Sequence, residues 1–443
     1  MLEPQRPGAH AAAGRVALAE HGPVVGEEVG EAAQQRGGIA SDADVPVQEQ
    51  HRPPPLPEFH SPLRSTWLTT LLGSVLLAGV AIVAVTGLLS HAAYQPDLGG
   101  NGLVSKDIGV LVVGWPTSPG WLYALTQGLH VTVGIVIVPL LLAKLWSVIP
   151  RLFEWPPVTG PANALERVGI LLLVGSAIFQ FATGIADAQL YYPWHFDFLE
   201  AHYYGGLIFI ASLVLHVAVK VPAMRRAYAT RRDVLAPDDT LRATDPAPAT
   251  LSRRGLFGLV GAAAGTLAVT TAGQSIGGPL RDLALFAPRG TGASFPVNKT
   301  AAVARITPAM VGDAYRLLLV GEGERELSLA DLAALPQHTY DLQIACVEGW
   351  STTQRWTGVR LRDLAAAAGL PGARAMQAGS LQPRGAFRQA TIGPGQIADG
   401  RSLLALQVNG APLPLDHGFP ARVIVPALPG VHCTKWVKEL HFT

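Results

Sequence analysis

Long apolar segments are the feature that most constrains what this chain can fold into. Four of them are near the ~20 residues that an α-helix needs to cross a bilayer: Thr66–Ser90, Trp121–Val148, Leu165–Ala186 and Ala201–Val221. A fifth, weaker segment, rich in glycine and alanine, runs from Leu256 to Ile276. Hydrophobic residues make up 49% of the chain and charged residues only 15%, which is too apolar for an ordinary soluble protein. The sequence therefore predicts an α-helical membrane bundle of four spans, with a fifth helix as a tether.

The lysines and arginines between the apolar segments predict how the bundle is oriented. The connections near residues 144–167 and 220–254 are rich in them, whereas the connection from His91 to Gly120 carries one, Lys106, and Asp187–Glu200 carries none. By the positive-inside rule, we expect a cytoplasmic N-terminus, five spans of the plasma membrane and an extracytoplasmic C-terminal domain. The formal net charge of +1 gives no indication of nucleic-acid binding.

Four histidines lie inside these segments or at their rims, where an ionisable side chain is costly and indicates function. His202 and His216 are separated by about 21 Å along the fourth helix and lie on nearly the same face of it. His91 ends the first segment, and His130 lies about 13 Å below the outer end of the second. Matching these depths predicts His91 with His202 around an outer haem and His130 with His216 around an inner one. Bis-histidine ligation suits electron transfer because it leaves no open position on the iron.

Two motifs near these histidines resemble a known class of membrane protein. Thr86-Gly-Leu-Leu-Ser-His91 and Gln127-Gly-Leu-His130 resemble motifs of the bacterial four-helix cytochrome b subunits of hydrogenases and formate dehydrogenases. The resemblance implies one or two b haems and electron exchange with a membrane quinone. The alternative is a bundle that only anchors the chain. We expect His195, in the outer connection, at an interface rather than as a ligand.

The C-terminal part carries a thiol at the end of an expected strand. An apolar run from Tyr340 to Val347 contains Cys346 and is followed by a glycine-containing turn, so that a strand would deliver one thiol to a loop. Soft metals prefer thiolate ligands. The only other cysteine is Cys433, and an exported domain could instead pair the two in a disulfide.

Two blocks of this part resemble the molybdopterin domain of the sulfite oxidase superfamily, over about Phe295 to Thr443. The first comprises Cys346-Val-Glu-Gly-Trp-Ser351, Trp356-Thr-Gly-Val359 and Leu361-Arg-Asp-Leu364. The second runs from Val408 to Pro426 and is followed by Gly430, Lys435 and Trp436. The resemblance implies a molybdenum centre bound by Cys346 that transfers an oxygen atom between the metal and a small-molecule substrate.

The same resemblance implies which residues bind the phosphate end of the cofactor. They are His417, Arg422, Lys435 and the backbone near Cys433, which stands where the family usually has serine; this position argues against the disulfide. The guanidinium of Arg422 offers a bidentate fork and Lys435 a point charge. The alternatives are a surface ion pair for Arg422 and a solvated strand edge for Lys435.

The substrate is not fixed by the sequence. Sulfite oxidases carry an Asn-Arg-Arg run soon after the metal cysteine, whereas Gln354-Arg355 here supplies one arginine. This departure argues against sulfite and is closer to the periplasmic sulfoxide reductases of the superfamily. We expect Trp350, Arg355 and Glu348 to line the substrate pocket. Alternatively, Trp350 belongs to the core and Glu348 makes a structural hydrogen bond.

A short basic motif before the fifth apolar segment predicts the export route. Ser252-Arg253-Arg254-Gly255-Leu256-Phe257 resembles a twin-arginine signal, which suits a domain that must cross the membrane folded around its cofactor. The alternative is two ordinary positive-inside arginines.

The predicted organisation has six parts. They are a disordered cytoplasmic tail (1–60), a four-helix cytochrome b-like membrane domain (61–228), a cytoplasmic linker (229–255), a fifth helix (256–277), a tether (278–298) and an α+β, mainly β, molybdopterin domain (299–443). In the last part, strands are expected at Tyr315–Val320, Tyr340–Val347, Leu403–Val408 and Arg422–Val425, and helices at Ser328–Ala334 and Arg360–Ala368. Two further hypotheses are a non-catalytic domain on the same scaffold and a cytochrome whose outer domain docks a partner.

Overall fold

The computed structural model describes residues 57–99, 101, 114–155, 157–229, 241, 243, 245–287 and 295–443. Most of the predicted tail, Lys106, most of the linker before residue 245 and residues 288–294 of the tether lie outside the described residues.

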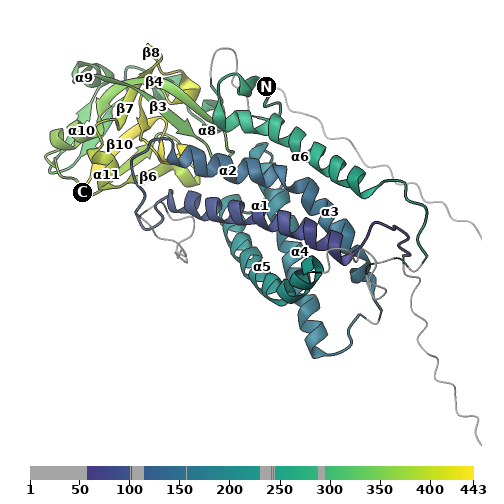
Figure 1. Ribbon diagram of the computed structural model, residues 1–443. Helices are drawn as coiled ribbons and strands as arrows, with labels where there is room; N and C mark the ends of the chain where they lie inside the picture. The colour runs from purple at the N-terminus through teal and green to yellow at the C-terminus, as the bar shows by residue number, and fades with distance from the viewer. Residues whose placement is uncertain are drawn as a thin grey trace, which may run out of the picture. The chain divides into compact units, whose positions relative to one another are not determined.

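Each of the five predicted apolar segments contains a helix (Figure 1). The helices are α1 (Thr66–Ala92), α2 (Leu122–Val136), α3 (Val138–Val148), η1 (Ile149–Phe153), α4 (Pro161–Ala188), α5 (Phe198–Ala229) and α6 (Arg253–Ile276). Of these, α1, α4, α5 and α6 are each long and apolar enough to cross a membrane.

The second predicted span is broken. Leu122–Val136 and Val138–Phe153 are bent by 41° relative to each other, and together they are long enough to cross a membrane. Pro139 lies at the start of α3. Because proline lacks an N–H and its ring clashes with the carbonyl four residues before it, a proline inside an apolar segment bends or ends a helix.

The helices expose apolar side chains to their surroundings. Leu171 on α4, Val214 on α5 and Leu259 on α6 are 67%, 64% and 63% exposed. Helices that are apolar on all faces need an apolar environment, which is what the interior of a bilayer offers.

The C-terminal part is mainly β, as predicted. In the described residues its strands are β1 (Leu317–Val320), β2 (Glu324–Leu327), β3 (His338–Ala345), β4 (Ser351–Arg360), β5 (Met376–Ser380), β6 (Gln389–Ile392), β7 (Leu403–Val408), β8 (Ala411–Pro412), β9 (Arg422–Ile424) and β10 (Val437–Phe442). One sheet has the order β2-β1-β10-β5-β6. The other has the order β3-β4-β7-β8, with β9 also paired to β7. The short helices are α7 (Leu280–Leu283), α8 (Ala301–Ala304), η2 (Pro308–Met310), α9 (Leu329–Ala334), α10 (Leu361–Ala367), η3 (Ala386–Arg388), α11 (Pro394–Ala398), η4 (Leu415–His417) and η5 (Gly430–His432).

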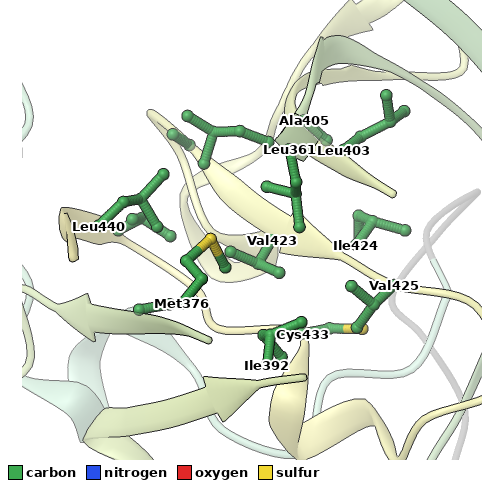
Figure 2. Packing of buried hydrophobic residues seen from close by; sticks show 14 of the residues in the cluster. Leu361, Met376, Ile392, Leu403, Ala405, Val423, Ile424, Val425, Cys433 and Leu440 are labelled. Atoms are coloured by element: carbon green, nitrogen blue, oxygen red, sulfur yellow. The ribbon is translucent and has the colours of Figure 1, made fainter. Parts of the chain in front are cut away.

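Both sheets contribute to one hydrophobic core. Met376 and Leu440 come from the first sheet, and Leu403 and Val423 come from the second. Figure 2 shows these residues packed around one another, with Cys433 between Ile392 and Val425. The structure places β1, β7, β9, α9 and α10 within the expected ranges, which confirms those predictions. Strand β3 overlaps the expected Tyr340–Val347 but begins two residues earlier and ends before Cys346.

Strand β4 was not predicted. Its first five residues, Ser-Thr-Thr-Gln-Arg, are polar and resemble a loop sequence. The strand forms because it pairs along its length with β3 and, from Trp356 onward, with β7. Strand formation depends on such neighbours more than on the intrinsic preference of the residues.

Polar contacts attach the β domain to one end of the helical bundle. The connection between α1 and α2 provides an Asn101–Thr391 contact, with the Asn101 amide 2.8 Å from the Thr391 carbonyl oxygen. The indole N–H of Trp115 donates to the Ala427 carbonyl at 2.6 Å. Near the end of α6, the Ser275 hydroxyl donates to the Gly349 carbonyl at 2.5 Å. These contacts bring the turn that carries Cys346 against the helices.

Candidate functional site

Cys346 is the first residue after strand β3, as predicted. The turn between β3 and β4 is closed by two backbone hydrogen bonds: the Cys346 N–H donates to the Trp350 carbonyl at 2.9 Å, and the Gly349 N–H donates to the Cys346 carbonyl at 3.1 Å. Gly349 has a φ of 88°, a left-handed conformation that glycine adopts without steric cost. A short turn closed in this way holds the thiol in a fixed position.

The Cys346 thiol is buried and free. It is 3% exposed, it forms no disulfide, and the side-chain amide of Asn298 lies 3.5 Å from its sulfur. Burial, and after it the nearby Glu348 carboxylate, raises the pKa of the thiol well above its usual range. A bound metal cation is what would convert such a thiol into a thiolate.

Two cations lie near the thiol and interact with backbone carbonyls. Arg422 is 7% exposed, and its guanidinium donates to the carbonyls of Cys433 at 3.3 Å and His417 at 3.1 Å. The Lys435 ammonium donates to the carbonyls of Lys299 at 2.5 Å and Asp416 at 2.9 Å. Burial, followed by the Arg422 charge, lowers the pKa of Lys435 to about 7.

These cations fit an anionic cofactor. In the described part of the chain, no carboxylate forms an ion pair with Arg422 or Lys435. A buried charge is costly unless an opposite charge compensates for it. A phosphate would compensate both cations, so the donor set matches the phosphate end of a molybdopterin. The surface ion pair considered for Arg422 is not what the structure shows.

One small cavity collects most of the predicted site residues. Its lining includes Cys346, Trp350, His417, Arg422 and Lys435. The segment Phe295–Asn298 covers the same cavity, with the Phe295 ring stacked on His417 at 3.7 Å between ring centres. Burial lowers the pKa of His417 to about 4, so this side chain is neutral at pH 7.

Trp350 and Glu348 are both buried beside the thiol. The indole N–H of Trp350 and one carboxylate oxygen of Glu348 are buried without a hydrogen bond of normal geometry within the described residues. Burial raises the pKa of Glu348. Trp350 also lines the cavity, and its indole lies next to the Glu348 carboxylate, with which it interacts.

Two predicted site residues lie outside this cluster. The Arg355 side chain is 64% exposed and forms an ion pair with Asp341 at 3.2 Å, so the structure does not place it in the pocket. The Cys433 thiol packs in the hydrophobic core (Figure 2). Only the backbone carbonyl of Cys433 faces the site, where it accepts a hydrogen bond from Arg422.

A second cavity lies among the helices and contains three of the four predicted haem ligands. It is lined by His91, His130 and His202, and by small residues such as Gly87, Gly134 and Gly206. A side chain at position 87 would collide with the His130 ring, so this glycine is what permits the position of that ring. Val347, the residue directly after Cys346, lines the same cavity.

The rings of His130 and His202 lie close together. Their ring centres are 6.2 Å apart and the rings are nearly perpendicular, at 83°. Two imidazoles on opposite faces of one metal have ring centres roughly 6 Å apart, given metal–nitrogen bonds of about 2 Å. Nδ1 of His130 lies 2.9 Å from the Val83 carbonyl, and Nδ1 of His202 lies 3.1 Å from the Thr183 hydroxyl. The Nε2 atom of each ring is therefore the one available to a metal. In known metal sites, a contact at the other ring nitrogen orients the histidine in this way.

The helical cavity brings together His91, His130 and His202, and the predicted pairings of His91 with His202 and of His130 with His216 stay predictions. His91 stacks on Tyr203 with ring centres 3.9 Å apart, while His130 lies with His202 rather than with His216. His216 does not line the cavity. It lies near Lys220, which forms an ion pair with Glu166 at 2.6 Å.

The structure also adds two residues that sequence reasoning did not assign. Asn298 reaches the Cys346 sulfur from a segment 48 residues earlier in the chain. Gln127 donates from α2 to the Val347 carbonyl at 2.5 Å. Gln127 belongs to the motif that ends in His130, but no local pattern indicates a contact with a strand more than 200 residues away.

Comparisons with known proteins agree with this site. Residues 304–443 match the family described as "Oxidoreductase molybdopterin binding domain". Mitochondrial sulfite oxidase of Rattus norvegicus is 36% identical over 159 residues, covering 29% of this chain and 29% of that protein. An uncharacterised oxidoreductase of Bacillus subtilis is 35% identical over 119 residues, covering 26% of this chain and 58% of that protein. Nitrate reductase of Hordeum vulgare is 38% identical over 101 residues, covering 21% and 11%.

The similarity defines one domain rather than the whole chain. This chain spans less than a third of the length of the rat sulfite oxidase that it matches. Residues 304–443 are an oxidoreductase molybdopterin-binding domain of the sulfite oxidase type, which confirms the predicted enzyme class and molybdenum cofactor for this part. The predicted haem, quinone and export route stay predictions.

Proposed function

We propose that this chain is a membrane-bound molybdenum oxidoreductase that transfers an oxygen atom at Cys346 and exchanges electrons with a membrane quinone through a b-type haem. The observation that carries the proposal is the position of Val347. This residue follows the predicted metal ligand and at the same time lines the cavity that contains His130 and His202. The two predicted redox sites therefore adjoin within one chain.

The residues around Cys346 would hold and orient the cofactor. When bound, the molybdenum cofactor supplies oxygen-atom transfer and accepts or donates two electrons. The turn after β3 fixes the Cys346 sulfur, and Asn298 donates a hydrogen bond to it. Arg422 and Lys435 would bind the phosphate end, and the cover formed by Phe295–Asn298 would limit access of water.

The residues around His130 and His202 would hold one haem. The two rings, with centres 6.2 Å apart and with Nδ1 atoms that already have partners, would supply ligands to the iron, and glycines leave room beside them. Two axial histidines make the iron an electron carrier. The positions of the histidines support one haem rather than two. His91 lines the same cavity as His130 and His202, and His216 does not.

The proposed location is the plasma membrane, with the C-terminal domain outside the cell. The β domain contacts the connection between α1 and α2 and the end of α6. The positive-inside rule predicts that these are the outer ends of the helices. Export of the folded domain by the twin-arginine machinery is part of this proposal, because a cofactor inserted in the cytoplasm must cross with its domain.

We infer that the substrate is a neutral S-oxide or N-oxide rather than sulfite. In the described lining of the small cavity, the cations are Arg422 and Lys435, and both are assigned to the cofactor phosphate. Arg355, the arginine that follows the metal cysteine, is exposed and paired with Asp341. With Arg422 and Lys435 both assigned to the cofactor, the described lining leaves no further cation for a dianion, which favours a neutral substrate.

Turnover in proteoliposomes tests the proposal. We expect the purified chain to reduce methionine sulfoxide with decylubiquinol as electron donor, and to do so faster than it oxidises sulfite with decylubiquinone. Faster sulfite oxidation would overturn the substrate class. Turnover with reduced methyl viologen but with neither quinone couple would overturn the haem-to-quinone route.

A further inference from the structure

Helix α2 lines the helical cavity and also contacts the turn that carries Cys346. Gln127, His130 and Val131 are three and four residues apart, so they lie on one side of the helix. All three line the helical cavity. The first and the last of them also contact the turn that carries Cys346.

These contacts involve the residues next to the thiol. The Gln127 side-chain amide donates to the carbonyl of Val347 at 2.5 Å, and Val347 is bonded directly to Cys346. At the other end of the turn, Gly349 packs so closely against Val131 that a side chain at position 349 would collide with it. The turn is therefore fitted to the surface of α2 at both ends.

We propose that Gln127 is the positioning residue that couples the Cys346 turn electronically to the His130 site, through its hydrogen bond to the Val347 carbonyl. This inference rests on the proposed function. The route runs from the Cys346 sulfur through one peptide unit to the Val347 carbonyl, across the hydrogen bond to Gln127, and along one turn of α2 to His130. Electron tunnelling falls steeply with distance and is slower through a gap than through bonds, so we expect the hydrogen bond at this point to raise the rate.

The electron balance fixes how often this route is used. Reduction of one S-oxide consumes two electrons and two protons and yields a thioether and water. Oxidation of one quinol to quinone supplies the two electrons and two protons. Two electrons, passing one at a time, therefore cross the contact between Gln127 and Val347 for each oxygen atom transferred.

A second attachment of the same turn provides a matched control. On α6, the Ser275 hydroxyl donates to the Gly349 carbonyl at 2.5 Å, and the Ser351 hydroxyl donates to the Ser275 carbonyl at 2.8 Å. These contacts hold the turn as the Gln127 contact does, but Ser275 is not on the helix that carries His130 and does not line the helical cavity. Comparing Gln127→Met with Ser275→Ala therefore distinguishes an effect on electron transfer from an effect of loosening the turn.

The kinetic experiment uses the full chain in detergent. The chain is first reduced with dithionite to about three electrons, two for the molybdenum centre and one for the haem. Methionine sulfoxide is then added to oxidise the molybdenum centre, and the haem reoxidation that follows is measured by stopped-flow absorbance. We expect Gln127→Met to slow reoxidation about tenfold at an unchanged haem-to-molybdenum ratio, and Ser275→Ala to stay close to wild type. Methyl viologen turnover, which bypasses the haem, is expected to fall less than the reoxidation rate. If haem were reoxidised at the same rate in both variants, whether slowly or fast, the proposed role of Gln127 would be refuted.

A second readout does not depend on bound cofactors. Hydrogen–deuterium exchange of the Cys346 and Gly349 amides, followed by mass spectrometry, reports how firmly the turn is held. We expect faster exchange in Gln127→Met than in wild type, with or without molybdenum. Unchanged exchange would show that the contact does not hold the turn and would overturn the inference. If wild-type protein contains no haem, the proposed function fails instead, and that result is distinguishable from unchanged exchange.

Discussion

Replacing Cys346 by serine is expected to lower molybdenum-dependent turnover by at least about 100-fold. Loss of residues that only orient a metal ligand typically costs 10- to 100-fold in metal affinity or activity, and Cys346 is the predicted ligand itself. Its thiol is buried at the end of β3 beside two cations that have no carboxylate partner among the described residues. The measurement is methyl viologen-linked reduction of methionine sulfoxide, together with molybdenum content by elemental analysis.

Cys433→Ala is the matched control for this prediction. The Cys433 thiol packs in the core between Ile392 and Val425 (Figure 2), and only its backbone carbonyl contacts Arg422. The variant is therefore expected to retain most of the turnover while losing some thermal stability. If Cys346→Ser kept full turnover, or if both variants lost it equally, the assignment of the metal ligand would be refuted.

Replacing His202 by alanine is expected to reduce the haem-to-protein ratio about tenfold or more. The His202 ring lies 6.2 Å from that of His130 in the helical cavity, with its Nδ1 held by Thr183. Without this ring one axial position on the iron is lost. The measurement is the dithionite-reduced spectrum of the purified variant, with haem quantified as the pyridine complex.

His216→Ala is the control, because His216 lies on the same helix but outside the cavity, near Lys220. We expect it to keep the wild-type haem content. Loss of haem in His216→Ala would support the pairing predicted from depth along the helices and would contradict the pairing of His130 with His202 that we propose. Full haem content in both variants would remove His202 from the ligand set.

The grouping of residues around Cys346 could largely be predicted because its signals are local. A strand followed by Cys346 and a glycine turn is encoded within ten residues, and the block that contains Arg422 and Lys435 lies on contiguous chain. Arg355 was misplaced because β4 was not predicted. On a strand, successive side chains point to opposite faces, so Trp356, which is buried, and Arg355, which is exposed, could not both face the site.

The arrangement of the histidines among the helices could not be predicted from the sequence. Depth along a straight helix gives one coordinate of a histidine, but the rotation and tilt of the helices are set by packing. His130 reaches its position beside His202 because Gly87 leaves space for its ring. Neither Asn298 nor Gln127 could be predicted, since each acts through a contact between segments far apart in sequence.

The most direct test of the account is the metal and haem content of the detergent-purified wild-type protein, by elemental analysis and a dithionite-reduced spectrum of one sample. The account predicts about one molybdenum and about one b-type haem per chain. Molybdenum without haem would reduce the helices to an anchor, and haem without molybdenum would leave a cytochrome with a docking domain. Absence of both from protein expressed with an intact cofactor supply would contradict the account as a whole.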